Sequence, residues 1–150
     1  MSEKKNENGY KGRFREIAAV LHKHEISKGI TPEKLRLILE DLGPTFVKVG
    51  QLMSLRSDIL PKNYCDELQK LCSDVPPMPF YEVEEVLRDS FGYEWQEEFE
   101  WIDKTPLGSA SIAQVHRARL KTGEEVVIKV QRKGIYETMA RDIGLMHKLV

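Results

Sequence analysis

The stretch Pro106-Leu-Gly-Ser-Ala-Ser-Ile-Ala-Gln-Val-His116 is followed, across a turn, by Val126-Val-Ile-Lys-Val130. The first segment places small residues between two expected strands, where backbone N–H groups can approach an anion closely. The second segment places Lys129 in an apolar strand, where a buried lysine is costly unless it meets a negative charge. Together, the two segments indicate a nucleotide-binding site.

Each segment also has a simpler explanation when it is taken alone. Small residues are common in ordinary hairpin turns, and a strand lysine is usually solvated. By alternation, Lys129 shares one face of its strand with Val127 and Gln131. Because the two segments lie on adjacent strands, both can reach one triphosphate, in the way that a kinase lysine contacts the α- and β-phosphates.

The composition limits the class of protein and its partners. With 150 residues, 41% of them hydrophobic, the chain can form one ordinary domain or one domain with a helical extension. Its 23 basic and 24 acidic side chains nearly cancel, so no global field favours nucleic acid. No apolar run approaches the ~20 residues that span a bilayer. We therefore expect a globular protein with no nucleic-acid partner, which meets any membrane from its surface.

The first half of the chain is expected to be helical. Residues 1–9 are polar and charged, which predicts a disordered tail. Residues 10–79 form the expected helical extension, and three helix starts within it are marked by Thr31-Pro32, Gly43-Pro44 and Pro61. Val75-Pro-Pro-Met-Pro79 cannot continue a helix, so we expect a segment boundary there.

Residues 80–150 begin with a short helical pattern and then change towards a period of two, which is typical of strands. We expect three antiparallel strands, at residues 99–102, 112–120 and 125–131, with Gly108 to Ser111 at a hairpin tip. A helix follows from Gly134 to Val150, and its expected buried side comprises Ile135, Met139, Ile143, Met146 and Val150. The predicted fold class is α+β.

A third constellation, Lys48-Val-Gly-Gln51, lies in an expected helix. Lys48 and Gln51 are three residues apart and share a face. Gly50 costs about 1 kcal/mol against alanine in a helix interior, so it indicates close approach by another element. Either a solvated face with a packing glycine or a polar face turned towards a partner or cavity explains this pattern.

The cysteines and histidines do not indicate a metal site. Cys65 and Cys72 are the only cysteines, and on one helix face they would lie about 10 Å apart, too far for a disulfide. Their sparse use favours a reducing cytosolic compartment. The histidines, which lack ligand spacing and are expected to be structural or solvent-facing, are His22, His24, His116 and His147.

Several motifs occur in order along the chain: Leu42-Gly-Pro-Thr-Phe-Val-Lys-Val-Gly-Gln51, Ser54-Leu-Arg-Ser-Asp-Ile-Leu-Pro61, Val75-Pro-Pro77, Ser109-Ala-Ser-Ile-Ala-Gln-Val-His116 and Val127-Ile-Lys-Val-Gln131. Together, from about residue 13 onward, they resemble the UbiB/AarF family of atypical protein-kinase-like proteins. The resemblance implies that residues 80–150 are part of a protein-kinase-like N-lobe, preceded by a helical extension with a K-x-G-Q motif. The C-lobe is absent from the printed residues.

The resemblance also implies roles for individual residues. Lys48, Gly50 and Gln51 would form a lid motif that lies across the active site and disfavours protein substrates. Lys129 would be the ATP-binding lysine, with ATP and Mg²⁺ as cofactors. The implied nucleotide-binding segment comprises Leu107, Gly108, Ser109, Ala110, Ser111, Ile112, Ala113, Gln114 and Val115. Gly108 and Ser109 replace alanines of many family loops. The family's catalytic and metal-binding acidic residues are assigned beyond residue 150, so no metal ligand is expected here.

The implied function is that of the ATP-binding portion of an atypical kinase or ATPase, linked to ubiquinone or other isoprenoid-lipid metabolism and close to inactive alone. We expect a cytoplasmic protein, bound peripherally to the inner face of a membrane, whose exposed apolar surface favours a homodimer. The alternative is a non-catalytic interaction or lipid-surface-binding module. The last residues, Leu149-Val150, fall within an unfinished helical pattern, which suggests a truncated reading frame or an engineered fragment.

Overall fold

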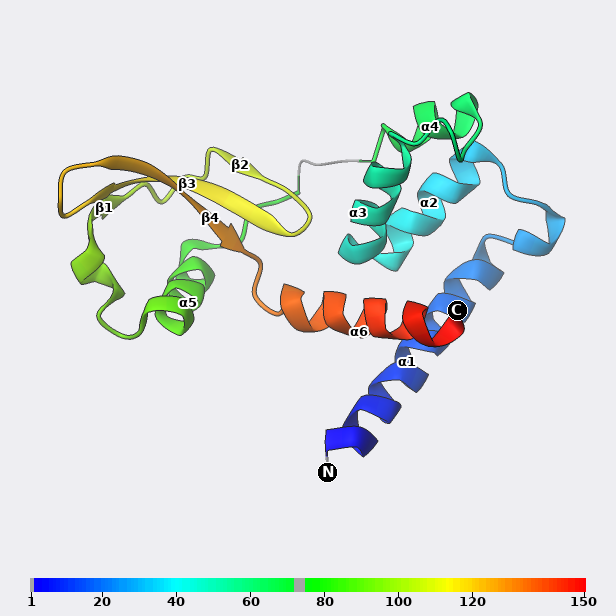
Figure 1. Cartoon of the computed structure of the whole chain (residues 1–150), viewed down its shortest axis with the longest axis horizontal. Coiled ribbons are helices and arrows are strands. Elements are labelled where there is room, and N and C mark those ends of the chain that lie inside the picture. The colour runs from blue at the N-terminus through cyan, green and yellow to red at the C-terminus, as the bar shows by residue number, and fades with distance from the viewer. Residues whose placement is uncertain (1, 72–74) are drawn as a thin grey trace. The chain divides into compact units, whose positions relative to one another are not determined.

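The computed structural model describes the backbone of residues 2–71 and 75–150, and the side chains of residues 7–71 and 75–150. The chain forms two compact units, which we call the helical unit (Met1–Leu71 with Glu137–Val150) and the sheet unit (Cys72–Tyr136). The elements of both units are drawn in Figure 1. This division differs from the predicted boundary at residue 79, because the final helix groups with the helical unit.

The helical unit contains α1 (Ser2–Lys23), a 3₁₀ turn (Ile26–Lys28), α2 (Pro32–Leu42), α3 (Pro44–Met53), α4 (Lys62–Leu68) and most of α6 (Ile135–Leu149). The predicted helix starts are confirmed: the Thr31 hydroxyl accepts the Lys34 N–H at 3.2 Å, and Pro32 and Pro44 occupy first turns. A disordered tail was predicted for residues 1–9, but α1 begins at Ser2. These residues contain several Glu and Lys residues, which favour helix, and no proline.

The apolar centre of the helical unit lies between α2, α3 and α4. Leu39, Leu68 and Leu71 are buried there, and Phe46 and Val47 pack against them. Gly50 confirms the predicted close approach, because a Cβ at this position would lie 2.5 Å from Leu71 Cδ1 and 2.7 Å from Leu39 Cδ1. The glycine therefore lets α3 approach α2 and the chain after α4.

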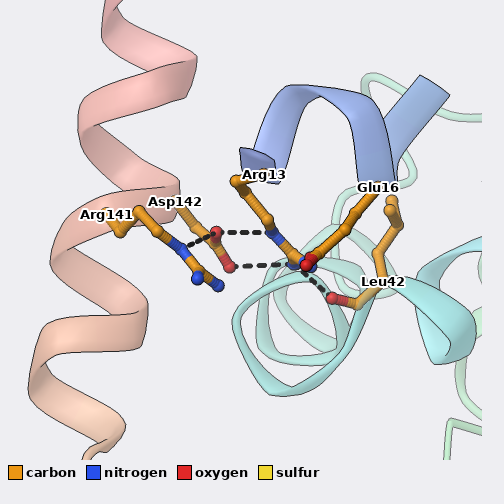
Figure 2. Close-up of polar contacts among 5 residues, drawn as sticks. All are labelled: Arg13, Glu16, Leu42, Arg141 and Asp142. Carbon is orange, nitrogen blue, oxygen red and sulfur yellow. Dashed lines mark hydrogen bonds and ion pairs between the residues drawn. The ribbon is translucent and has the colours of Figure 1, made fainter. Parts of the chain in front are cut away.

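A buried ion pair joins α1 to α6 (Figure 2). Arg13 donates from Nε and Nη2 to the Asp142 carboxylate, at 2.8 and 3.1 Å, and also donates to the Leu42 carbonyl at the end of α2. The Asp142 side chain is 0% exposed. Burial opposes the charge on Arg13, but the hydrogen bonds to Asp142 and Glu16 outweigh this and raise the pKa of the guanidinium.

This ion pair corrects part of the predicted buried side of the last helix. Ile143 and Val150, expected on the buried side of α6, are exposed, whereas Asp142 and Leu145 are buried. Ile135 is buried and Met139 and Met146 are half-buried, so the apolar periodicity predicted this face in part but missed Asp142. Arg13, from a distant part of the sequence, compensates the charge and draws Asp142 inward.

The sheet unit contains α5 (Phe80–Phe91), a 3₁₀ turn (Trp95–Glu98), β1 (Phe99–Ile102), β2 (Gly108–Ser109), β3 (Ala113–Leu120) and β4 (Glu125–Gln131). Strand β3 is central: β4 pairs antiparallel along one edge, and β1 and β2 pair with successive parts of the other edge. The three predicted strands are present, but β2 was missed. Its two residues are too few to produce a periodic signal.

One face of this sheet is covered and the other is open. Helix α5 covers the face that carries Ala118 and Val130, and this core also holds Val83, Leu87 and Trp95. The opposite face, which we call the open face, carries Val115, Arg117 and Arg119 of β3, paired across the ladder with Lys129, Val127 and Glu125 of β4. Of the helices that the structure describes, none has the length and hydrophobicity needed to cross a bilayer.

Candidate nucleotide-binding site

Lys129 lies on the open face of β4, directly across the ladder from Val115. The predicted alternation is correct, because Lys129 shares this face with Val127 while Val130 points into the core. The lysine itself is exposed rather than buried, so its charge is solvated. It forms no hydrogen bond or ion pair with another described residue, which leaves its ammonium group available to an anionic ligand.

Apolar side chains adjoin this cation on the same face. Val127 is 59% exposed, and Val115 is partly exposed on the neighbouring strand. An apolar surface beside a free cation suits a ligand with a flat, weakly polar ring and an anionic tail. A nucleoside polyphosphate has both parts.

The small-residue segment is more than a hairpin tip, which corrects the prediction. Gly108 and Ser109 form β2, opposite Val115 and Gln114, so the true tip is residues 110–112. This tip is held by a bond from Ala110 N–H to the Ala113 carbonyl at 2.8 Å, and the Val75 N–H donates to the Ser109 carbonyl at 3.1 Å. The loop is therefore fixed both internally and to the proline-rich segment.

Gln114 does not face the open side, although it was predicted within the nucleotide-binding segment. Its side chain is 0% exposed, and its Oε1 accepts the Met78 N–H at 2.7 Å. Its Nε2 donates to His116 Nε2 at 2.9 Å, and His116 Nδ1 donates to the Asp103 carbonyl at 2.7 Å. Because a carbonyl can only accept, the proton of His116 is on Nδ1. Gln114 and His116 thus join the proline-rich segment to the sheet.

The other residues of the predicted segment are divided between exposed and buried positions. Leu107 and Gly108 are exposed, Ser109, Ala110 and Ile112 are half-buried, and Ser111 and Ala113 are buried. Strand alternation explains part of this division, since successive side chains point to opposite faces. The assignment of this segment to nucleotide binding stays a prediction.

The sequence analysis missed Arg132, which follows β4 directly. Its Nε donates to the Ala110 carbonyl at 2.9 Å, and its Nη2 donates to Ser109 Oγ at 2.7 Å and to the Pro76 carbonyl at 3.0 Å. In the sequence it stands in Gln131-Arg-Lys133, a polar run that reads as an ordinary solvated strand end. No local signal distinguishes it, because all three acceptors are distant in sequence.

Lys48, Gly50 and Gln51 belong to the helical unit. Lys48 and Gln51 are half-buried on one face of α3, and their side chains hydrogen-bond no described residue. Gly50 is explained by packing against Leu39 and Leu71. The lid role implied for these residues stays a prediction.

The described residues supply no evident metal site. Among them, no group of three His, Cys, Asp or Glu side chains gathers as metal ligands. Mg²⁺ prefers carboxylate and phosphate oxygens, so the described residues do not fit it by themselves. Cys65 is buried, and Cys72 lies outside the described residues, so the expectation about their separation is not tested.

The ABC1 atypical kinase-like domain matches residues 70–150, which include the open face, the loop and Arg132. The chain belongs to this family. Membership confirms the resemblance to UbiB/AarF proteins, and the helical unit with an antiparallel sheet confirms the predicted α+β class, a kinase-like N-lobe with a helical extension. At family level, the chain is part of an atypical kinase-like protein.

Two similar proteins show the extent of the match, and one of them carries a kinase name. A probable protein kinase UbiB of Pseudomonas putida strain GB-1 is 48% identical over 120 residues, which is 80% of this chain and 22% of that protein. An uncharacterized protein in the hydrogenase 1 5′ region of Clostridium pasteurianum is also 48% identical over 120 residues, 80% of this chain and 23% of that protein. The chain therefore spans less than a quarter of the length of these curated relatives.

Among solved structures, the complex of Rv3197 with erythromycin from Mycobacterium tuberculosis aligns at 36% identity and a TM-score of 0.47. The alignment covers 74% of this chain and 29% of that one.

Proposed function

We propose that this chain is the ATP-binding portion of an atypical kinase or ATPase of the UbiB type. The observation that carries the proposal is Lys129, an exposed cation without a carboxylate partner among the described residues, between Val115 and Val127 on the open face. An adenine ring would lie on the two valines, and the phosphates would extend from Lys129 towards loop 110–112. Family membership supports this assignment of the strand lysine.

The finer roles follow from the family resemblance. Lys48 and Gln51 would restrict access to the phosphates and disfavour protein substrates, and the whole protein would act in ubiquinone or other isoprenoid-lipid metabolism. The 150-residue chain alone is expected to hydrolyse MgATP only at background rate, because phosphoryl transfer depends on positioned metal ions and an acidic catalytic residue. Detectable Mg²⁺-dependent hydrolysis that co-purifies with the chain would contradict this expectation.

Binding of MgATP to a Lys129→Met variant tests the site. Methionine keeps the length of the side chain and removes the charge, so the affinity for MgATP should fall about 10- to 100-fold. Lys121→Met is the matched control, since it removes one exposed lysine from the turn of the same hairpin. Equal affinities of the Lys129→Met and Lys121→Met variants would refute the assignment of Lys129.

A lipid-surface role is the second candidate, favoured by an apolar patch in the helical unit. Leu52, Leu55 and Ile59 are 57, 75 and 62% exposed at the end of α3 and in the following turn. Exposed apolar clusters mark interaction sites, and the expected location is peripheral, on the inner face of a membrane. The chain should co-sediment with anionic vesicles, and the double variant Leu52→Ser, Leu55→Ser should no longer do so. Homodimerisation without vesicle binding, seen by light scattering, would favour a second copy instead.

A further inference from the structure

Arg132 contacts only neutral acceptors around the loop. Its guanidinium binds the Ala110 carbonyl, Ser109 Oγ and the Pro76 carbonyl, and it forms no ion pair with a described residue. Its backbone N–H adds a fourth bond, to the Ile112 carbonyl at 2.8 Å. A half-buried arginine with no carboxylate partner is unusual, and here its donors converge on the segment that would meet the phosphates.

These contacts fix the direction of the loop peptides. In a trans peptide, the C=O and N–H groups point to opposite sides. Because Arg132 holds the Ala110 carbonyl, the N–H of Ser111 in the same peptide points away from the guanidinium. That N–H donates to no described residue. A group held in this way can donate to an anion with little reorganisation.

The arginine also joins the loop to two other parts of the sheet unit, β4 and the proline-rich segment. Arg132 follows Gln131, the last residue of β4, and Val130 of the same strand is buried in the core. Its third acceptor, the Pro76 carbonyl, belongs to the proline-rich segment. That segment is itself held by Gln114 at Met78. A planar guanidinium can span three acceptors at once, whereas a lysine ammonium is a single point charge.

We propose that Arg132 is a positioning residue, which holds loop 110–112 in the geometry that receives the nucleotide phosphates. The inference rests on the proposed function, since it assumes that a nucleotide binds at this loop. Arg132 acts through the loop peptides and makes no contact with the ligand itself. Its contribution therefore concerns the phosphates and not the nucleoside.

Nuclear magnetic resonance of the full 150-residue chain tests whether Arg132 holds the loop and whether it affects the binding of the phosphates alone. MgATP and adenosine are titrated separately into the wild-type chain and into Arg132→Ala, Arg132→Lys and Ser109→Ala variants. The Ala110 N–H donates to the Ala113 carbonyl, so its hydrogen-exchange rate without ligand measures how firmly the loop is held. Lys133→Ala is the matched control, because Lys133 is the adjacent cation and pairs with Glu85 rather than with the loop.

Arg132→Ala should weaken MgATP binding about tenfold, leave adenosine binding within about twofold, and accelerate exchange at Ala110. Arg132→Lys should lose nearly as much affinity for MgATP as Arg132→Ala, and Ser109→Ala should lose less. Full recovery in Arg132→Lys, equal losses for MgATP and adenosine, or unchanged binding in Arg132→Ala would overturn the positioning role. A wild-type chain that binds no MgATP would contradict the proposed function, and the inference with it.

Discussion

The helical unit and the sheet unit bury polar groups in different ways. In the helical unit, arginines meet carboxylates: Arg13 pairs with Asp142, and Arg36 pairs with Glu67. In the sheet unit, the buried polar groups are neutral, as in the chain of bonds from Met78 through Gln114 to His116. Arg132 likewise contacts only neutral acceptors.

This difference bears on where an anion can bind. A cation that already holds a carboxylate has its charge compensated, and an incoming phosphate would have to displace that partner. Arg13 and Arg36 are in this state, whereas Lys129 and Arg132 have no carboxylate partner among the described residues. The helical unit thus pairs its buried arginines with carboxylates, whereas Lys129, which we propose for the nucleotide, and Arg132, which we propose for the loop, have no such partner among the described residues.

The largest expected effect comes from breaking the buried pair of the helical unit. Asp142→Ala leaves Arg13 buried without its main partner, which should lower the free energy of unfolding by about 3 kcal/mol. Arg141→Ala is the control: its Nε lies 3.5 Å from Asp142, and its side chain is 37% exposed. It should cost less than about 1 kcal/mol. Equal losses in urea denaturation would show that the pair does not hold α1 to α6.

A somewhat smaller effect is expected from the neutral network of the sheet unit. Gln114→Met keeps the shape of the side chain but leaves the Met78 N–H and His116 Nε2 unpaired, at a cost of about 2 kcal/mol. Gln131→Met, at an exposed position of β4, should change stability by less than about 0.5 kcal/mol. A Gln114→Met variant with wild-type stability would mean that solvent replaces these hydrogen bonds. The contrast between the two units would then fail.

The smallest expected effect is a pH dependence of stability in the helical unit. Hydrogen bonds from Lys70 and Arg36 lower the pKa of Glu67, whose side chain is 7% exposed. A carboxyl with a lowered pKa in the folded state stabilises the fold above its unfolded pKa of about 4.3, and the stabilisation is lost as the pH falls through the folded pKa.

Thermal unfolding from pH 7 to pH 3 should therefore show the full wild-type advantage over Glu67→Gln at neutral pH and a progressive decline of this advantage as the pH falls below about 4.3. Glu25→Gln removes an exposed partner of Lys28 and should give parallel curves at every pH. An advantage over Glu67→Gln that stays constant from pH 7 to pH 3 would exclude the ionised carboxylate as its source.

Local signals in the sequence predicted the helix starts and the strand alternation. Thr31, Pro32 and Gly43 act on neighbouring backbone groups, so their meaning does not depend on the rest of the fold. The alternation of β4 likewise assigned Lys129 and Val127 to one face. Gly50 was correctly expected to permit close approach, because few other causes explain a glycine inside an amphipathic helix.

Features that depend on distant partners were missed. Asp142 is buried because of Arg13, and Arg132 contacts acceptors from two earlier segments. Strand β2 exists only through its pairing with β3, and Gln114 faces Met78 because the proline-rich segment crosses the covered side of the sheet. Residue types and spacing contain no information about such partners until the chain is folded.

The most direct test of the account compares the two faces of one sheet during a titration with MgATP. If the open face binds the nucleotide, the methyl resonances of Val115 and Val127 should shift with saturation, while those of Val126 and Val130, on the covered face, should stay in place. Lys129→Met should reduce the shifts of the open face. Shifts of equal size on both faces, or shifts confined to Val126 and Val130, would contradict the proposed nucleotide site.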